Sequence, residues 1–405
     1  MKKDSCRFCS SSLNRIFIDL GKTPLANSFL DESELKKDEL IIPLIAYVCE
    51  KCFLVQLKES SSPNEIFSNY AYFSSYSTTW LKHAESYVEM MLENYQFTKD
   101  SLVIELASND GYLLQYFKEK KIPVLGIEPA ENVAKSAIKK GIDTRIDFFT
   151  KDLALNLKNN QKQADLIIAN NVLAHVPELN DFVHGIKILL KDDGLATLEF
   201  PHLLNLIEKN QFDTIYHEHF SYFSLLTVKK IFDYHDLKIF EVDELPTHGG
   251  SLRLFVTHNE NNDVDEHPSV RLILDKEKKF GLDKLETYKE FAQKVVKCKE
   301  DSVSKIKAIK DNGESIIGYG SPAKATTVLN YYGIDNNSID YIIEDNEMKH
   351  GKLLPGVRIP IQSKNGVLDN PPDNILVLAW NFFDYIKKNN QELVDKGCEF
   401  ITLKD

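Results

Sequence analysis

The sequence lacks several features that would assign it to a class directly. No apolar run in its 405 residues approaches the roughly 20 needed to cross a bilayer, and the N-terminus MKKDSCRFC has no apolar stretch after its lysines. We therefore expect neither a membrane span nor a signal peptide. The 61 acidic residues outnumber the 49 basic ones, and a net charge of −12 argues against sequence-independent nucleic-acid binding. Six cysteines are too few for a disulfide scaffold, so we expect a reduced, cytoplasmic protein.

Four of those cysteines form two Cys-x-x-Cys pairs near the N-terminus: Cys6, Cys9, Cys49 and Cys52. Two pairs with this spacing can close a tetrahedral zinc site, whereas a redox dithiol or two unrelated buried pairs are the alternatives. Four thiolates leave no open coordination position, so the zinc would be structural. The segment has no basic cluster with interleaved aromatic residues, which disfavours a nucleic-acid-binding zinc ribbon.

A tyrosine-rich segment, NYAYFSSYSTT, follows at residues 69–79. Tyr70, Tyr72 and Tyr76 are separated by even numbers of positions and would share one face of a strand. Their hydroxyl groups could line a pocket, but a β-edge or turn with half-buried rings is the simpler interpretation.

From residue 101 the sequence alternates between apolar strands and amphipathic helices. This pattern predicts a doubly wound α/β sheet with its ligand at the carboxyl ends of the strands. We expect strands at 101–107, 123–128, 164–169, 195–200, 237–242 and 251–257. The expected helices are one that follows Gly111 and ends at 120, and others over 130–140, 179–191 and 225–235. Gly194 is expected to cap the third of these helices.

A turn with a single glycine, A-S-N-D-G, follows the first of these strands, and Glu128 ends the second. An acid in that position accepts hydrogen bonds from ribose hydroxyl groups. The turn lacks the G-x-G-x-x-G pattern that a pyrophosphate requires, which favours S-adenosylmethionine (SAM) over NAD; a plain turn is the alternative. The expected cofactor-binding residues are Glu105, Ala107, Asn109, Asp110, Gly111, Glu128, Pro129, Asn170 and Asn171.

The segment DTIYHEHFSYFS places Tyr216, His217, Glu218 and His219 in a row, in a crossover at the carboxyl edge of the sheet. Four such polar residues cannot all be buried without partners, and their spacing differs from the H-E-x-x-H of a metal site. A solvated loop is the alternative interpretation. His175 is a further candidate, for which packing or a helix cap would be the simpler role.

Two glycine-containing turns could bind an anionic ligand. T-H-G-G-S-L-R contains His248, Gly249 and Arg253, although it could be an ordinary hairpin turn. After one or two charged helices over 263–311, the strand S-I-I-G-Y-G leads into Ser321 and Lys324 at the start of another helix. Free N–H groups there would suit a diphosphate. We expect a second, smaller Rossmann-like unit, with NAD binding through Glu344 or an empty scaffold as alternatives.

These motifs, in this order, resemble the SAM-dependent sugar C-methyltransferases, which act on nucleotide-linked keto-sugars in deoxysugar biosynthesis. The shared segments are the paired C-x-x-C motifs with LGKTPLANSF, ELASNDGYLL, GIEPA, NNVLAHVP, TIYHEHFSYF, HGGSLR and GYGSPAKATT, and they cover nearly the whole chain. The resemblance implies a zinc-binding domain at 1–68, a class I SAM methyltransferase domain at 69–262, and a helical linker with a Rossmann-like substrate-binding domain at 263–405. The substrate would lie between the second and third domains.

The resemblance also implies that Tyr216, Glu218 and His219 carry catalysis, with support from His175 and from Tyr70 or Tyr72. Carbon becomes nucleophilic only when a proton is removed beside a carbonyl group, and a 4-keto sugar offers such a carbon at C3 or C5. We expect His219 to be the base, and phenol or imidazole donors to stabilise the enolate oxygen.

The expected substrate is a TDP- or GDP-linked keto-sugar, and neither nucleic acid nor a membrane is an expected partner. The expected substrate-binding residues are Tyr76, His248, Gly249, Arg253, Gly320, Ser321 and Lys324. We expect a monomer or a small homo-oligomer. An O- or N-methyltransferase acting on a similar sugar, a zinc-ribbon regulatory protein and an idle α/β scaffold are the alternatives.

Overall fold

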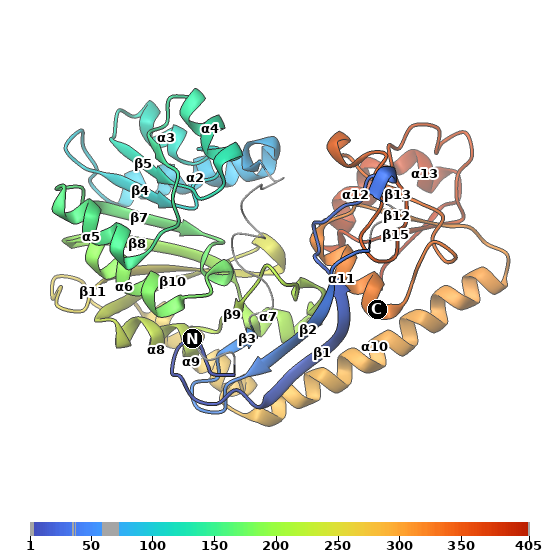
Figure 1. The fold of residues 1–405 in the computed structure, drawn as a ribbon, viewed down its shortest axis with the longest axis horizontal. Helices are drawn as coiled ribbons and strands as arrows, with labels where there is room; N and C mark the ends of the chain where they lie inside the picture. Colours follow the sequence, from blue (N-terminus) through green and yellow to red (C-terminus); the bar gives the residue numbers. More distant parts are fainter. Residues whose placement is uncertain (1–3, 35, 37, 59–72, 404–405) are drawn as a thin grey trace.

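The computed structural model describes residues 4–34, 36, 38–58 and 73–403. Its strands form a four-stranded, a seven-stranded and a five-stranded sheet. The seven-stranded and five-stranded sheets belong to two α/β units that stand side by side, and the N-terminal strands lie between them (Figure 1). This architecture confirms the expected mixed α/β fold. Among the described residues, no helix is both long and apolar enough to cross a bilayer.

The N-terminal sheet is antiparallel and takes its last strand from a distant part of the chain. Its strands are β1 (Arg15–Pro24), β2 (Ile41–Val48), β3 (Val55–Leu57) and β9 (Ser221–Tyr222). β3 pairs with β9 through Val55 opposite Tyr222 and Gln56 opposite Ser221. Because β9 begins two positions after His219, this pairing holds one end of the Tyr216–His219 segment on the N-terminal sheet.

The central sheet has five parallel strands and an antiparallel pair at one edge, in the order β10-β11-β8-β7-β4-β5-β6. The strands are β4 (Val103–Leu106), β5 (Val124–Ile127), β6 (Thr144–Arg145), β7 (Ala164–Asn170), β8 (Leu190–Pro201), β10 (Leu237–Leu245) and β11 (Ser251–His258). Alternate residues of β7 enter separate cores, Ile167 on one face of the sheet and Leu166 on the other. Helices therefore cover both faces, as a buried parallel sheet requires.

The helices of this unit are α2 (Thr78–Asn94), α3 (Leu114–Glu119), α4 (Glu131–Lys139), α5 (Lys151–Asn159), α6 (Leu179–Leu189), α7 (Leu203–Glu208) and α8 (Leu225–Tyr234). One expected boundary is wrong: α6 ends at Leu189, β8 begins at Leu190, and Gly194 lies inside the strand. A Cβ atom at Gly194 would lie 2.8 Å from Leu190 Cδ1 and 3.0 Å from the Ala164 carbonyl oxygen. Close packing between strands, and not a helix cap, therefore explains this glycine.

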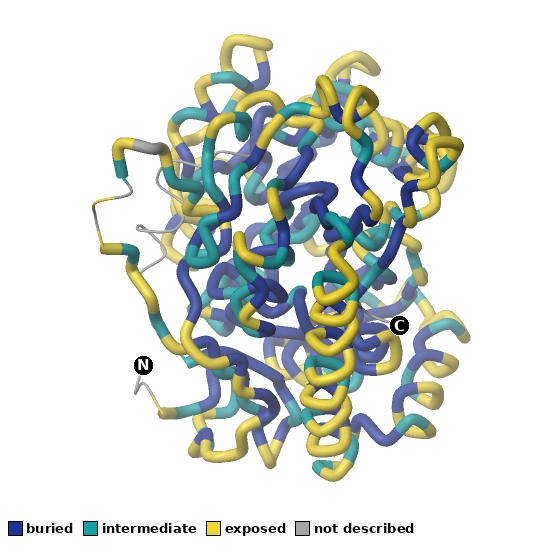
Figure 2. The backbone as a smooth tube through the Cα atoms, turned by 90° about the vertical axis from the view of Figure 1, so that its right-hand side faces the viewer, coloured by how far each residue is buried: buried dark blue, intermediate teal, exposed yellow. Residues whose placement is uncertain are grey.

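The C-terminal unit is a wholly parallel sheet that two helices connect to the rest of the chain. α9 (Pro268–Phe280) and α10 (Leu285–Asp311) lead to strands in the order β14-β13-β12-β15-β16. These strands are β12 (Ile316–Tyr319), β13 (Ile342–Ile343), β14 (Ile361–Gln362), β15 (Asn374–Val377) and β16 (Glu399–Ile401), with helices α11 (Ala323–Tyr332), α12 (Phe383–Asn389) and α13 (Gln391–Asp395). The outer side of α10 is exposed along its length (Figure 2). Its inner side packs Tyr288 and Phe291 on Phe17 of β1, at ring-centroid distances of 5.6 and 5.2 Å.

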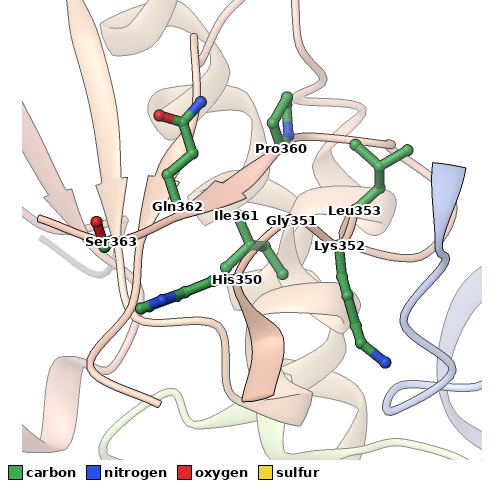
Figure 3. Close-up of a pocket in the computed structure, with 8 residues that line it drawn as sticks. All are labelled: His350, Gly351, Lys352, Leu353, Pro360, Ile361, Gln362 and Ser363. Atoms are coloured by element: carbon green, nitrogen blue, oxygen red, sulfur yellow. The ribbon is translucent and has the colours of Figure 1, made fainter. Parts of the chain in front are cut away.

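A surface hollow of about 400 Å³ lies beside β14 in the C-terminal unit. Two short stretches of chain, His350–Leu353 and Pro360–Ser363, line it (Figure 3). One of them bridges to the N-terminal domain, because Leu30 and Leu353 exchange backbone hydrogen bonds. The hollow contains none of the residues that the sequence predicts for catalysis or binding.

Candidate active site

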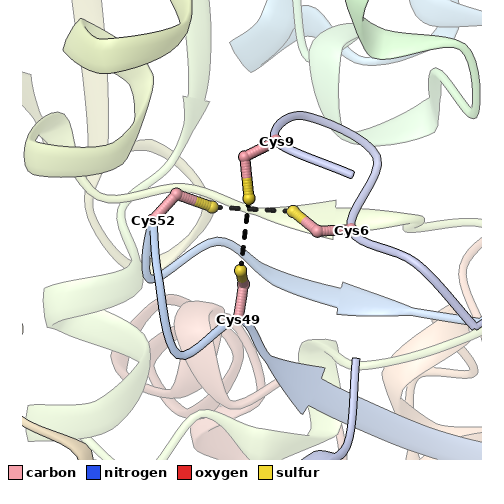
Figure 4. Close-up of side chains that lie close together, drawn as sticks. All are labelled: Cys6, Cys9, Cys49 and Cys52. Atoms are coloured by element: carbon pink, nitrogen blue, oxygen red, sulfur yellow. Dashed lines mark hydrogen bonds between the residues drawn. The ribbon is translucent and has the colours of Figure 1, made fainter. Parts of the chain in front are cut away.

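The four N-terminal cysteines form a cluster that fits a zinc ion. Their sulfur atoms all lie within 4.8 Å of one another, and they point toward a common centre (Figure 4). Cys6 and Cys52 are 3.5 Å apart at sulfur, as are Cys9 and Cys49. A tetrahedral site with Zn–S bonds of about 2.3 Å separates its sulfurs by about 3.8 Å. The geometry therefore fits a closed, structural zinc site.

The turn after β4 has the backbone shape of a ligand-binding loop. Ala107, Asn109 and Gly111 all have positive φ, at 53°, 51° and 76°. Glu128, at the end of β5, accepts hydrogen bonds from the Asn109 N–H at 2.9 Å and from the Ala130 N–H at 2.8 Å. The Glu128 carboxylate thus fixes both the turn after β4 and the turn after β5. Pro129 lies in the second of these turns, between Glu128 and Ala130.

Several buried polar atoms at this edge of the sheet have no hydrogen-bond partner among the residues that the structure describes, which fits a polar ligand there. They are Glu105 Oε2, Ser108 Oγ, Asp110 Oδ1, Asn170 Oδ1, and Oδ1 and Nδ2 of Asn171. Buried polar groups without partners are unfavourable, so a ligand with hydroxyl and amino groups would stabilise them. Burial, together with the nearby Glu128 and Asp110 carboxylates, raises the pKa of Glu105 well above its usual value. The expected cofactor residues therefore lie together around β4, β5 and β7.

Sequence reasoning missed three residues that close this turn. The Ser74 N–H donates to Asn109 Oδ1 at 2.9 Å, the Ser75 hydroxyl donates to Asp110 Oδ2, and Lys140 Nζ lies 2.8 Å from the same oxygen. Nothing in the sequence indicated that Ser74 and Ser75, which lie in the tyrosine-rich segment, would contact the turn after β4. Residues 74–76 form a short 3-10 helix and α2 begins at Thr78, so this part of the segment is a turn and not a β-edge, the two alternatives of the simpler interpretation. Tyr70 and Tyr72 lie outside the described residues.

His175 and His219 form a pair of imidazoles at the same carboxyl edge. Their ring centroids are 4.8 Å apart. His175 Nδ1 lies 2.8 Å from the carbonyl oxygen of Glu218, and His219 Nδ1 lies 3.0 Å from that of Thr214. A carbonyl oxygen can only accept, so each Nδ1 carries the proton and each ring has its lone pair on Nε2. Burial lowers the pKa of His175 to about 4, and burial with the neighbouring His175 and His248 lowers the pKa of His219 well below 6.5.

The other polar residues of the segment point in different directions. The Tyr216 ring lies beside His219, with a centroid distance of 4.1 Å. Glu218 is 6% exposed and accepts a hydrogen bond from Asn27 Nδ2 at 2.7 Å, and burial raises its pKa to about 7. His217 is instead directed to the N-terminal sheet, where its Nε2 lies 3.1 Å from the Pro43 carbonyl oxygen. Asn27 is a further residue that sequence reasoning missed.

Only some of the residues expected to bind substrate lie together. A Cβ atom at Gly249 would lie 2.9 Å from the Trp380 ring, and Lys324 lies beside the same ring. His248 is exposed and lies beside the Trp80 ring, at a centroid distance of 5.3 Å, and Tyr76 is 69% exposed. The carbonyl of Gly249 accepts from Gln211 Nε2 at 3.0 Å. Arg253 is buried and donates through Nε to Glu199 at 2.7 Å. Since Glu199 also binds His83 at 2.9 Å, this arginine belongs to a buried ionic network.

The turn after β4, which we call the cofactor turn, is fixed by a carboxylate that accepts backbone N–H groups. The C-terminal unit repeats this arrangement. Glu344, directly after β13, accepts from the Ser321 N–H at 2.8 Å and from the Asn346 N–H at 3.1 Å. Gly320, before Ser321, has a φ of 82°. Lys324 Nζ lies 4.4 Å from the centre of the Trp380 ring. Trp380 in turn donates from Nε1 to Asp213 at 2.6 Å, which connects this unit to the segment of Tyr216–His219.

Comparison with known proteins finds relatives of the whole chain. Three family descriptions match in order: a zinc binding domain over residues 6–67, a methyltransferase domain over 82–242 and a C-methyltransferase C-terminal domain over 246–403. The chain is 32% identical to the C-methyltransferase NovU of Streptomyces niveus over 98% of its length and 95% of that protein. The chain belongs to this C-methyltransferase family. It is therefore a SAM-dependent methyltransferase with an N-terminal zinc-binding domain, as the sequence predicted.

Two solved structures illustrate how far the overall similarity extends. The magnesium protoporphyrin IX methyltransferase of Synechocystis, solved with bound SAM, has a TM-score of 0.34 and 16% identity, and the match covers 44% of this chain and 79% of that one. An S-adenosylmethionine-dependent methyltransferase from Listeria monocytogenes has a TM-score of 0.36 and 15% identity, with coverages of 44% and 100%.

Proposed function

We propose that this C-methyltransferase transfers a methyl group to C3 or C5 of a nucleotide-linked 4-keto sugar, the carbons next to the ketone. The observation that carries the proposal is the pair of neutral imidazoles, His175 and His219, whose lone pairs lie on Nε2. They belong to loops at the carboxyl edge of the sheet, where the cofactor turn also lies. The nucleotide sugar and the reducing conditions that keep the four cysteines from forming disulfides would place the enzyme in the cytoplasm.

His219 Nε2 is the proposed base. Its lowered pKa keeps the ring neutral throughout the physiological pH range, so it does not have to lose a proton before it can accept one. It removes the proton from the carbon beside the ketone, and the electron pair moves toward the carbonyl oxygen. Bound SAM supplies an electrophilic methyl group on its sulfonium. The new C–C bond forms as the S–CH₃ bond breaks, and His219 then releases its proton to solvent.

Glu218 is the proposed partner of the developing enolate oxygen. A carboxyl group whose pKa is about 7 is largely protonated just below neutral pH and can then donate a hydrogen bond. Burial makes such a donor more effective because little water competes with it. Tyr216 and His175, next to His219, would complete the set of polar groups around the reacting carbons.

The nucleotide part of the substrate is proposed to bind to the C-terminal unit. The turn of Gly320 and Ser321 precedes α11, and Lys324 in the first turn of that helix would face a diphosphate. The ten-residue helix contributes N–H groups at its start, and Lys324 contributes a positive charge. Trp380, beside Lys324, would give the base or the sugar an aromatic surface. A TDP- or GDP-sugar fits this chemistry.

Replacing His219 with asparagine tests the base. We expect turnover to fall about 10²- to 10⁴-fold, because a general base contributes roughly that much. The affinity for S-adenosylhomocysteine, measured by calorimetry, should not change. His184→Asn on α6 is the matched control, since it removes an imidazole outside the pair. Near-normal turnover in His219→Asn would contradict the assignment.

A further inference from the structure

The N-terminal domain holds the segment of Tyr216–His219 along its length. His217 Nε2 donates to the Pro43 carbonyl of β2 at 3.1 Å, and the Leu57 N–H donates to the Phe220 carbonyl at 3.0 Å. A third contact involves a side chain of the proposed chemistry: Asn27 Nδ2 donates to Glu218 Oε1 at 2.7 Å. This contact joins residues that are 191 positions apart in the chain.

Asn27 is held in place by its neighbours. It follows β1, and the carbonyl of Ala26 accepts a hydrogen bond from the Thr326 hydroxyl of α11 at 2.9 Å. Three residues further on, Leu30 forms the backbone bridge with Leu353. Asn27 is itself exposed, whereas Glu218 is 6% exposed. Its amide group therefore lies at the solvent side of a buried carboxyl group, in a loop fixed to the C-terminal unit on both sides.

We propose that Asn27 is a positioning residue that holds Glu218 Oε1, so that the acidic proton of Glu218 sits on Oε2 and is directed to the substrate oxygen. This inference rests on the proposed function, in which Glu218 donates to the enolate. An N–H donor and an O–H proton compete for the same oxygen, so the oxygen that accepts from Asn27 is the one that stays unprotonated. A protonated carboxyl group without such a partner could carry its proton on either oxygen.

The electrostatic surroundings of Glu218 support this role. Burial raises its pKa, and the Asn27 N–H acts in the opposite direction because it stabilises the carboxylate form. The titratable and charged groups near the segment include His175 from the loop after β7, Tyr222 of β9 and Arg7 of the N-terminal domain. Tyr216, His217 and His219 belong to the segment itself. Burial lowers the pKa of all three histidines, so they are neutral at pH 7. Asp213, near the start of the segment, is held by Trp380.

The test compares Asn27→Leu with Ser28→Ala, a substitution in the same exposed loop. Removing the N–H donor should lower kcat about 10- to 100-fold, which corresponds to the loss of a hydrogen bond to an ionisable group. KM and the affinity for S-adenosylhomocysteine should stay near their wild-type values. The fall in kcat above neutral pH, which reports ionisation of Glu218, should move to higher pH. Asn27→Asp should move it in the same direction, because a second carboxylate disfavours the ionised form.

Glu218→Gln separates the inference from the function on which it rests. If that variant keeps the wild-type rate and pH profile, the proposed role of Glu218 fails, and the inference about Asn27 fails with it. If Glu218→Gln loses the alkaline fall while Asn27→Leu keeps both the wild-type kcat and the wild-type profile, the inference alone is overturned. A lower kcat in Asn27→Leu with an unmoved profile would also overturn it, since a purely structural loss would have that effect.

Discussion

The chemistry proposed for this enzyme depends on which atoms of a few buried side chains carry protons. Two carbonyl groups, of Glu218 and Thr214, fix the protons of His175 and His219 on Nδ1. Burial disfavours the charged form of each ring, and it favours the neutral form of the Glu218 carboxyl. The same buried environment therefore provides a neutral base, His219, and a neutral acid, Glu218, in adjacent residues.

The pH dependence of the wild-type enzyme follows from these shifts. The His219 base is active when neutral, and because its folded-state pKa is lowered, activity is retained as the pH falls through 6.5. Glu218 is active when protonated, so kcat falls as the pH rises through about 7. Initial rates at saturating substrate between pH 5 and 9 would show this shape. A rate that instead rises steadily above pH 7 would exclude the protonated carboxyl from the mechanism.

The sequence indicated which polar residues gather in this segment, but it did not indicate where their side chains point. Tyr216, Glu218 and His219 stood out because four polar residues in a row need partners, yet His217 looked equivalent to them and binds the N-terminal sheet instead. Arg253 looked like an anion ligand but is paired with Glu199 in the interior. Asn27 gave no signal, because its partner is distant in the chain and only the tertiary fold brings the two together.

At the scale of single elements, the 3-10 turn at residues 212–214 connects the C-terminal unit to the proposed base. Trp380 Nε1 donates to Asp213 Oδ2 at 2.6 Å, and the Thr327 hydroxyl of α11 donates to the Ile215 carbonyl at 3.1 Å. Thr214, between these two anchored residues, provides the carbonyl that fixes His219 Nδ1. Substrate bound to the C-terminal unit would therefore influence the position of residues 212–214, the turn that orients His219.

Trp380→Phe tests this connection. The variant keeps an aromatic ring beside Lys324 but loses the N–H that binds the 1%-exposed Asp213. We expect kcat to fall about 10-fold or more, because a hydrogen bond to a charged group is worth roughly 1.5–3 kcal/mol. Binding of S-adenosylhomocysteine should be unaffected. Phe382→Leu, in the same turn and 50% exposed, is the control, and equal rates in the two variants would contradict the connection.

Element types were predictable where the pattern was long and regular, and less so elsewhere. The strands of the central sheet were expected from apolar runs, except for β6, and β12 of the C-terminal sheet was expected in the same way. β6 and β14 were not expected, because two residues are too few to show a pattern. Helix α5 was not expected, although Thr150 caps its start. The pairing of β3 with β9 was not predictable either, because it joins residues about 165 positions apart and each strand is very short.

At the scale of the whole molecule, the zinc-binding domain is the platform on which the proposed catalytic segment rests. Its sheet includes β9, its Pro43 and Asn27 bind His217 and Glu218, and Arg7 between the first two cysteines donates to the Phe220 carbonyl at 3.3 Å. The cofactor turn is built on β4, β5 and β7 of another sheet. Loss of zinc should therefore affect catalysis more than cofactor binding.

Cys49→Ser, or removal of the metal with a chelator, tests this separation. A structural zinc site contributes folding free energy directly, so we expect the melting temperature to fall by about 5 °C or more. Turnover should be lost in proportion to the zinc released, while the protein that remains folded still binds S-adenosylhomocysteine. Cys298→Ser, outside the cluster, should keep its zinc and its rate. Full turnover in zinc-free protein would contradict the platform role.

The central claim is that the enzyme removes a proton from a sugar carbon next to a ketone and places a methyl group on that carbon. The most direct measurement uses a nucleotide-linked 4-keto sugar deuterated at C3 and C5, together with SAM carrying a ¹³C-labelled methyl group. We predict a product with the labelled methyl on C3 or C5 and no deuterium on that carbon, as seen by NMR and mass spectrometry. A product with the label on oxygen or nitrogen and all of its deuterium retained would contradict the claim.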